Sequence, residues 1–282
     1  MRFLIAALIF FALSCGNNNV PEQEHVFVLS GKKSLVPDSA KQRLLRILEG
    51  GWVNEDYISA LDDLHSPVKA ASAGLPERQM AFDISHVNGD TLVNGRGRMD
   101  YDATERFDIV FFMKRDSTVG FRIGENPGYN DEQYALNYSF ENNDTILLLT
   151  VSGEKTVTYR FRRVFRAFPE SDNVTITAIE YFINETLFNG KWKSSDGKET
   201  EFLPDGRVKN FKGYKRYSVY CEKENAVSRP DEISFYNDTS GVTYAYTLID
   251  NVLKFYELKE SDDGMEISRG KLVTSMEMVK AE

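Results

Sequence analysis

Side chains that commonly carry out catalysis are few in this sequence, and they form no recognisable site. The histidines, His25, His65 and His86, are scattered, and none has a second ligand at the spacing of a metal site. No serine lies in the Gly-X-Ser-X-Gly pattern of a nucleophile elbow, and the sequence has no glycine-rich phosphate-binding loop. We therefore expect no metal, no cofactor and no catalytic residue, which means a protein that is not an enzyme.

The two cysteines, Cys15 and Cys221, are too few for a disulfide framework. Cys221 ends the strand-like run Tyr-Ser-Val-Tyr-Cys, and no base is suggested beside it. We expect its side chain to be a small buried hydrophobic group and not a nucleophile.

Residues 100–104, Asp-Tyr-Asp-Ala-Thr, match the nucleophile motif of haloacid-dehalogenase phosphatases. That chemistry needs the first aspartate at the end of a buried parallel strand that a helix follows. Here the run falls in an acidic turn between segments with the pattern of antiparallel strands, so we interpret it as a turn.

The composition is that of a globular protein with an acidic surface. Hydrophobic residues make up 41% of the chain and charged residues 27%, and the net charge is −9. Binding to a nucleic-acid backbone needs clustered lysine and arginine, and no basic run appears, so we expect no nucleic-acid partner. With 282 residues, the chain is long enough for two domains that each bury a core.

The N-terminus has the features of an export signal. Met1 and Arg2 precede an apolar run that ends near Leu13, which is too short to cross a membrane as a helix. The run continues into Ala-Leu-Ser-Cys-Gly and resembles the lipobox of bacterial lipoproteins, although Ala12 stands where the common pattern prefers leucine. The resemblance implies that residues 1–14 are a signal peptide and that Cys15 carries acyl chains such as palmitate. An ordinary signal peptide with an incidental cysteine is the alternative.

Residues 15–38 are expected to form a flexible tether, because the segment after Cys15 is polar and rich in turn-forming residues. Stable anchoring needs more than one acyl chain, and the resemblance implies a multiply acylated terminus. The expected partner at this end is thus a membrane, and the expected location is the bacterial cell envelope, at the outer membrane.

The rest of the chain has two tryptophans, and each follows a short amphipathic helical pattern. They lie in Gly50-Gly51-Trp52 and Gly190-Lys191-Trp192. Residues 39–42 and 177–180 ahead of them have the spacing of capping boxes, which predicts a helix start at each place. The matching order indicates an internal repeat.

After each tryptophan the apolar residues alternate with period two, which predicts short antiparallel strands. In the first repeat, two helical patterns at residues 56–64 and 68–73 come before most of the strands. The second repeat has no such insertion, and eight strands are its natural count. We predict a mainly β protein with two tandem antiparallel barrels, at residues 39–166 and 173–282.

The phrase glycine, any residue, tryptophan at the start of the first strand resembles the lipocalin-like (calycin) superfamily. The resemblance implies that Trp52 and Trp192 close one end of each barrel and that an arginine from the last strands packs across each ring. The candidate arginines are Arg160, Arg162 and Arg163 in the first repeat and Arg269 in the second. The helical insertion is similar to the lid of fatty-acid-binding proteins.

The leading functional hypothesis is non-catalytic binding of a small apolar ligand by the first barrel. Five aromatic residues of the predicted lid and strand faces would line the cavity: Tyr57, Phe107, Phe111, Tyr134 and Tyr138. The same apolar stripes would also fill a solid core. The alternative is therefore an interaction or scaffold module with solid barrels, which would hold an envelope protein or a glycan.

Overall fold

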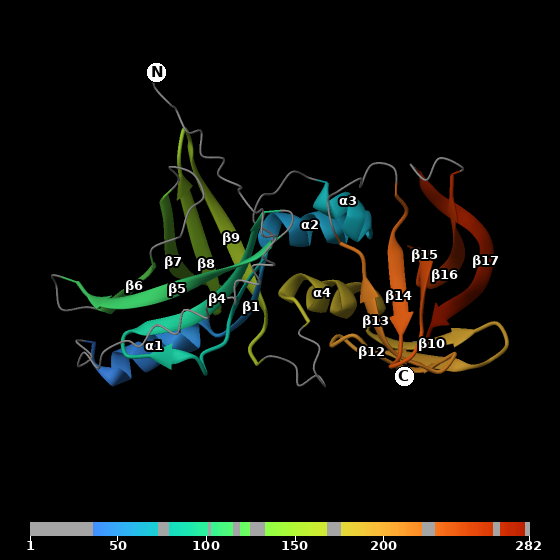
Figure 1. Cartoon of the computed structure of the whole chain (residues 1–282), viewed down its shortest axis with the longest axis horizontal. Coiled ribbons are helices and arrows are strands. Elements are labelled where there is room, and N and C mark those ends of the chain that lie inside the picture. The colour runs from blue at the N-terminus through green and yellow to red at the C-terminus, as the bar shows by residue number, and fades with distance from the viewer. Residues whose placement is uncertain are drawn as a thin grey trace, which may run out of the picture. The chain divides into compact units, whose positions relative to one another are not determined.

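The computed structural model describes residues 36–72, 79–100, 103–114, 119–124, 133–167, 176–221, 229–261 and 266–279 (Figure 1). Within these ranges, the side chains of residues 94–100, 103–107 and 133 are not described. The predicted signal peptide, Cys15 and most of the predicted tether lie outside the described residues, so those predictions stay predictions.

The first half of the chain forms a sheet with three helices. Its elements are α1 (Asp38–Leu48), β1 (Gly50–Asn54), α2 (Glu55–Leu64), α3 (Pro67–Ala71), β2 (Gln79–Phe82), β3 (Val87–Asn88), β4 (Thr91–Asp100), β5 (Ala103–Met113), β6 (Val119–Ile123), β7 (Gln133–Glu141), β8 (Asp144–Ser152) and β9 (Thr156–Phe165). In the described residues the sheet has nine strands, in the order β6-β5-β4-β2-β1-β9-β8-β7, with β3 on β4. The first strand thus pairs with the last, as it would in an up-and-down barrel.

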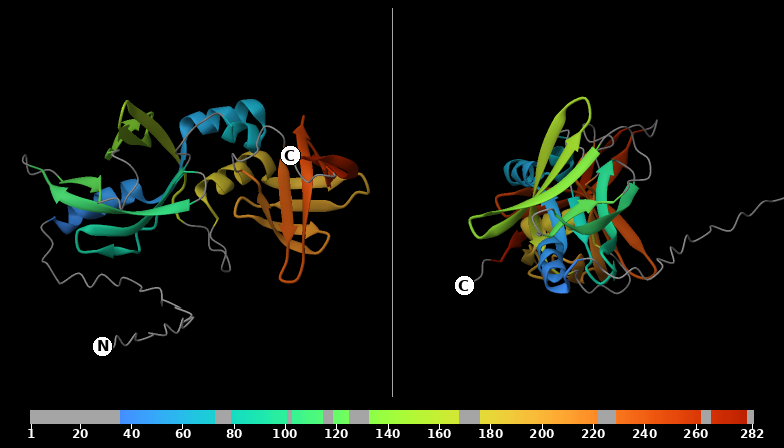
Figure 2. Two further views of the ribbon diagram at one scale, coloured as in Figure 1. Left: turned by 45° about the horizontal axis from the view of Figure 1, so that its top comes forward. Right: turned by 90° about the vertical axis from the view of Figure 1, so that its left-hand side faces the viewer.

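The edge strands β6 and β7 are not hydrogen-bonded to each other in the described residues, so a closed first barrel is not seen. The two edges nevertheless meet through their side chains. Phe121 of β6 stacks on Tyr138 of β7, with ring centroids 5.9 Å apart. Figure 2 shows the curvature of this sheet. Its inner face and α1 share one hydrophobic cluster, which includes Leu45, Trp52 and Phe161.

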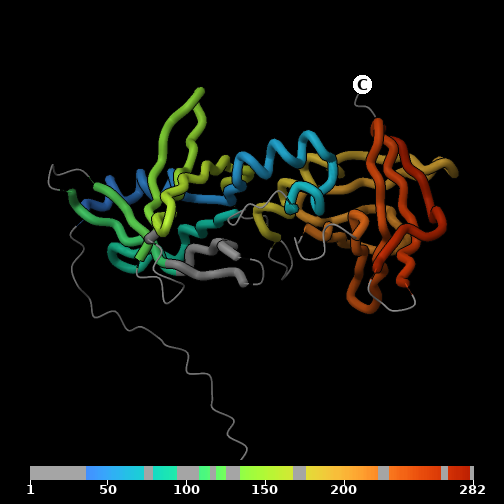
Figure 3. The backbone as a smooth tube through the Cα atoms, turned by 90° about the horizontal axis from the view of Figure 1, so that it is seen from above, coloured from blue at the N-terminus to red at the C-terminus, as the bar shows by residue number. Residues whose placement is uncertain are grey.

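The second half of the chain forms the closed eight-stranded antiparallel barrel that the sequence predicts. Its elements are α4 (Ala178–Ile183), the π-helical turn η1 (Asn184–Phe188), β10 (Gly190–Ser194), β11 (Glu199–Phe202), β12 (Arg207–Phe211), β13 (Tyr214–Val219), β14 (Glu232–Tyr236), β15 (Gly241–Ile249), β16 (Val252–Glu260) and β17 (Ile267–Met278). Pairing of β10 with β17 closes the barrel in the described residues. The backbone of this half of the chain runs from yellow to red in Figure 3.

Aromatic rings fill the inside of this barrel. Phe202, Phe235 and Phe255 are fully buried, and Phe235 lies within ring-contact distance of both others. Tyr217 and Tyr246 are also buried, and both contact Phe188 from the end of η1. An eight-stranded barrel is just wide enough for side chains to fill it, and these rings do so.

The two tryptophans are held in the same way by the helical segments that precede them. The indole N–H of Trp52 donates to the carbonyl of Leu48 at the end of α1, and that of Trp192 donates to Phe188 at the end of η1, each at 2.7 Å. Gly50 and Gly190 turn the chain between helix and strand with φ of 109° and 128°, which favour glycine.

The two predicted capping boxes have different outcomes. Thr177 and Glu180 form the reciprocal capping box at the start of α4, as predicted. At the first helix the prediction was wrong. Helix α1 begins at Asp38, and Pro37 before it makes no side-chain cap bond, so Ser39 is already inside the helix.

Helices α2 and α3 are inserted between β1 and β2 as predicted, but they do not cover a first barrel. Buried residues of these helices, including Tyr57, Leu61 and Ala70, belong to the hydrophobic cluster of the second barrel, with Val219 and Tyr246. The expectation of a lid on the first barrel was therefore wrong. The amphipathic pattern predicted a buried face without indicating which sheet would bury it.

Candidate functional site

The residues predicted to bind an apolar ligand are only partly brought together. Phe111 is 2% exposed in the cluster of the first sheet, and Tyr134 and Tyr138 pack against that cluster. The side chain of Phe107 lies outside the described side chains. Tyr57 is fully buried in the cluster of the second barrel, so placing it with the other four was wrong. Its helix contacts strands β1 and β9 of the first sheet and shares its hydrophobic cluster with the barrel.

Arg163 is the arginine that packs on Trp52, out of the three that the resemblance left open. Its Cζ lies 4.5 Å from the centroid of the indole ring. Its Nη2 donates to the carbonyls of Ile47 at 2.5 Å and Arg46 at 3.3 Å, in the last turn of α1. One guanidinium therefore joins the tryptophan, the helix end and strand β9.

Trp192 has no arginine over its ring among the described residues. Its neighbour on β17 is Met278, whereas Arg269 is exposed near the other end of that strand. The predicted role of Arg269 was therefore wrong. The two repeats share the helix and tryptophan but differ in the residue opposite the ring.

A bulge in β9 helps to bring Arg163 and its neighbours to one place. Gly51 pairs with Phe165 and Trp52 with Arg163, which leaves Val164 without a partner in the register. Strand β9 ends at Phe165, and Arg166, the next residue, lies beside Gly50. A side chain at Gly50 would collide with the carbonyl of Phe165, so glycine permits this close approach.

Helix α1 contributes a second set of polar side chains to the same place. Its buried face packs on the sheet, and its exposed face carries residues at three- and four-residue spacing. With the ends of β7, β8 and β9, this face lines a pocket of about 500 Å³. The lining residues are Ser39, Gln42, Arg43, Arg46, Ile47, Phe140, Thr145, Arg163 and Arg166. We call this site the arginine pocket.

The charges of the arginine pocket are mostly uncompensated. In the described part of the chain, the side chains of Arg43, Arg46 and Arg166 form no hydrogen bond or ion pair. The Nε atom of Arg163 is buried and has no hydrogen-bond partner there either. Burial lowers the pKa of Arg163, and the neighbouring charge of Arg166 lowers it further. The pocket therefore favours an anion.

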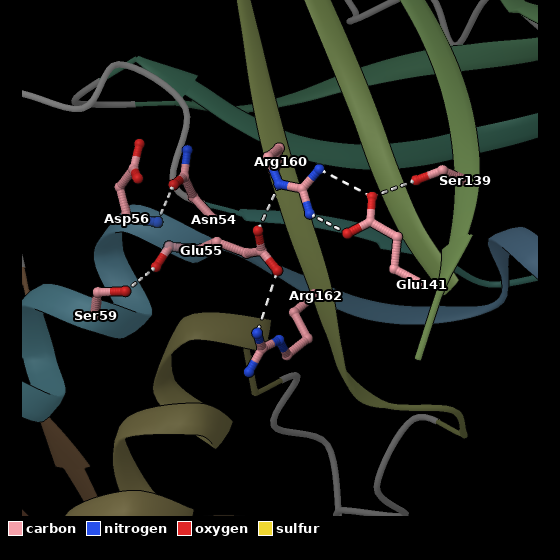
Figure 4. A network of polar contacts seen from close by, with 8 residues as sticks. All are labelled: Asn54, Glu55, Asp56, Ser59, Ser139, Glu141, Arg160 and Arg162. Atoms are coloured by element: carbon pink, nitrogen blue, oxygen red, sulfur yellow. Dashed lines mark hydrogen bonds and ion pairs between the residues drawn. The ribbon is translucent and has the colours of Figure 1, made fainter. Parts of the chain in front are cut away.

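Other arginines of the same strand are neutralised (Figure 4). Arg160 donates to Glu55 at 2.7 Å and binds Glu141 through both terminal nitrogens, and Arg162 donates to Glu55 at 3.2 Å. The hydrogen bond from Arg160 lowers the pKa of Glu141. This network joins the start of α2 to β7 and β9. Strand β9 thus has one arginine set in ion pairs and another set beside a pocket.

The sequence interpretation missed the arginine pocket because its members are far apart along the chain. Arg43 and Arg46 precede β1, whereas Arg163 and Arg166 end β9, and pairing of β1 with β9 brings them together. The signal that could have indicated the pocket was the concentration of arginine at residues 160–166 in a chain of net charge −9.

The described residues show no other chemical centre. They contain no group of histidine, cysteine or carboxylate side chains that could hold a metal ion, and none of their helices is long and apolar enough to cross a membrane. Cys221 is buried and not in a disulfide, which agrees with the expectation of a buried side chain. No protein-family model, curated protein or solved structure matches the chain.

Proposed function

We propose that the protein is a non-catalytic, lipid-anchored protein of the bacterial envelope that acts as an interaction module and does not carry an apolar ligand inside its barrel. Its two repeats would be lipocalin-like, with Cys15 as the site of acylation. This was the alternative in the sequence interpretation. One observation supports it: the interior of the closed second barrel is filled by Phe202, Phe235, Phe255 and their neighbours, which leaves no room there for a ligand.

The helices α2 and α3 add to this argument because they belong to the same cluster as the barrel core. Asp231, just before β14, accepts hydrogen bonds from the hydroxyl of Ser66 at 2.8 Å and from the backbone N–H of Val68 at 3.3 Å. The start of α3 is thus bonded to the barrel as well as packed on it. A ligand would have to displace both the rings and this contact.

The first sheet keeps the carrier hypothesis open as a second candidate. Its edge strands are joined in the described residues by the stacked rings of Phe121 and Tyr138 and not by a ladder of hydrogen bonds. Tyr134 and Tyr138 are only partly buried against the cluster. An apolar molecule would enter between β6 and β7.

A fluorescent fatty-acid analogue distinguishes the two candidates. We expect no saturable binding by the purified protein. Saturable binding that Phe111→Arg abolishes and Phe235→Leu leaves intact would contradict the interaction module and place a ligand in the first sheet. Circular dichroism of both variants would confirm that they fold.

The anchor is tested separately by mass spectrometry of the native N-terminus. We expect a chain that begins at an acylated Cys15, and a Cys15→Ser variant that leaves the membrane fraction. An unmodified Cys15 in the mature protein would contradict the anchor.

A further inference from the structure

The arginine pocket has more positive charge than its structural role needs. Arg163 has a structural role, because it binds the ring of Trp52 and the last carbonyls of α1. Arg46 in the last turn of α1 also complements the negative end of the helix dipole. No such role accounts for Arg43 and Arg166, which line the same pocket.

Several other arginines of this acidic protein are held in ion pairs. Arg160 is paired with Glu55 and Glu141, Arg207 with Asp205, and Arg229 with Glu232. Among the described residues, the carboxylates that act on Arg163 are Glu49 and Asp144, and neither forms an ion pair with it. An excess of positive charge therefore remains in the pocket.

The form of the pocket suits a compact anion that has an organic part. Guanidinium groups present planar pairs of donors that match the oxygens of phosphate, and Arg163 is held in place by its ring and carbonyl contacts. Ser39, Gln42 and Thr145 add neutral polar groups to the lining. Phe140, which is 60% exposed, adds an apolar surface. The volume of about 500 Å³ lies in the usual range for small-molecule sites.

We propose that the arginine pocket binds a phosphate group carried by a small organic molecule, with Arg43, Arg46 and Arg166 as ligands of the phosphate and Arg163 as a fixed positive charge in the lining. The phosphate could belong to a phospholipid headgroup or to a soluble phosphate ester. Both sources present the same oxygens. The headgroup source rests on the proposed membrane anchor at Cys15, whereas the soluble source does not.

The test uses the whole mature chain, which begins at residue 15, and it has two arms. In one arm, glycerol phosphate and inorganic phosphate are titrated calorimetrically. In the other, binding is measured to vesicles of phosphatidylcholine with and without phosphatidylglycerol, using Cys15→Ser protein so that acyl chains do not contribute. Saturable binding in the first arm alone assigns a soluble ester, and binding that requires phosphatidylglycerol assigns a lipid headgroup.

Variants connect either result to the pocket. The double variant Arg43→Gln/Arg166→Gln removes two exposed charges, and we expect it to weaken the affinity by about tenfold or more, because two charged donors to the phosphate are lost. The matched control Arg122→Gln removes an exposed charge from β6 and should leave the affinity unchanged. No saturable binding in either arm, or equal losses in the variant and the control, would overturn the proposal. Neither result depends on the fatty-acid assay.

Discussion

At the scale of single residues, the contact between Arg163 and Trp52 is the most informative feature of the first repeat. The tryptophan is fully buried, its indole N–H is bonded to Leu48, and the guanidinium lies across its ring. The second repeat has the same buried tryptophan with Met278 opposite it. Met278 therefore pairs with the second tryptophan as Arg163 pairs with the first, and methionine is the apolar replacement that the chain itself offers for Arg163.

Replacing Arg163 by methionine should lower the free energy of unfolding by about 1–3 kcal/mol, because the variant loses the ring contact and the bonds to the carbonyls of α1. Urea denaturation measures the change. Arg162→Met is the control, and its loss should stay below about 1 kcal/mol because its bond to Glu55 is largely exposed. Equal losses in the two variants would show that Arg163 is no more than a surface charge.

Asp231 provides a prediction about pH. Its burial raises the pKa of the carboxyl group, and this outweighs the hydrogen bonds from Ser66 and Val68 that lower it. The folded state therefore keeps the proton to a higher pH than the unfolded state, so the contribution of Asp231 to stability falls as the pH rises through its raised pKa.

Asp231→Asn keeps an oxygen acceptor for both bonds and removes this titration. The free energy of unfolding of the variant relative to the original protein should therefore increase as the pH rises from below the unfolded pKa to neutrality. Denaturation at a series of pH values measures the difference. A difference that grows as the pH falls would mean that the carboxylate, and not the acid, is the form favoured by the fold.

At the scale of elements, helix α2 packs on two parts of the chain: it contacts its sequence neighbour β1 and strand β9, and it shares a hydrophobic cluster with the barrel. Leu61 is fully buried in the cluster of the second barrel, although its helix follows the first strand of the first sheet. Leu61→Ala should cost about 2–5 kcal/mol because it leaves a cavity in that cluster. Hydrogen exchange should locate the effect in β13 to β15.

The exposed neighbour Asp62 gives the control for this experiment, since Asp62→Ala removes no buried group. Faster exchange confined to β1 and β2 after Leu61→Ala would contradict the packing of α2 on the barrel.

The elements could be predicted from the sequence to the extent that local pattern determines them. The alternation of the second repeat predicted its eight strands, and the phrase around Trp192 predicted the start of its first strand. The face of α2 was predicted to be buried, but a helical stripe does not specify its partner. The arginine pocket could not be predicted in this way, because Arg43 and Arg166 meet only through the pairing of β1 and β9.

At the scale of the whole molecule, one hydrophobic cluster includes residues of both repeats. Val53 and Phe165 from the first sheet share it with Ile179 of α4 and with the barrel. The side-chain oxygen of Gln79 in β2 accepts a hydrogen bond from the backbone of Ile179 at 2.9 Å. We therefore expect the two repeats to unfold as one unit.

Each repeat has its own tryptophan, which makes this expectation measurable. In Trp192→Phe and Trp52→Phe variants, the fluorescence of the remaining tryptophan and the far-ultraviolet circular dichroism should give coincident denaturation curves within each variant. Separate transitions would show that the shared cluster does not couple the repeats.

We propose that this chain recognises its ligand at the arginine pocket and not inside a barrel. Trp52 reports on it directly, because Arg163 both covers its ring and lines the pocket. The most direct measurement is the emission of the Trp192→Phe variant during titration with glycerol phosphate at constant ionic strength. The claim predicts a saturable change that Arg43→Gln/Arg166→Gln removes and that the Trp52→Phe variant does not show. An emission that does not change, or that changes as much when chloride is added in place of glycerol phosphate, would contradict this proposal.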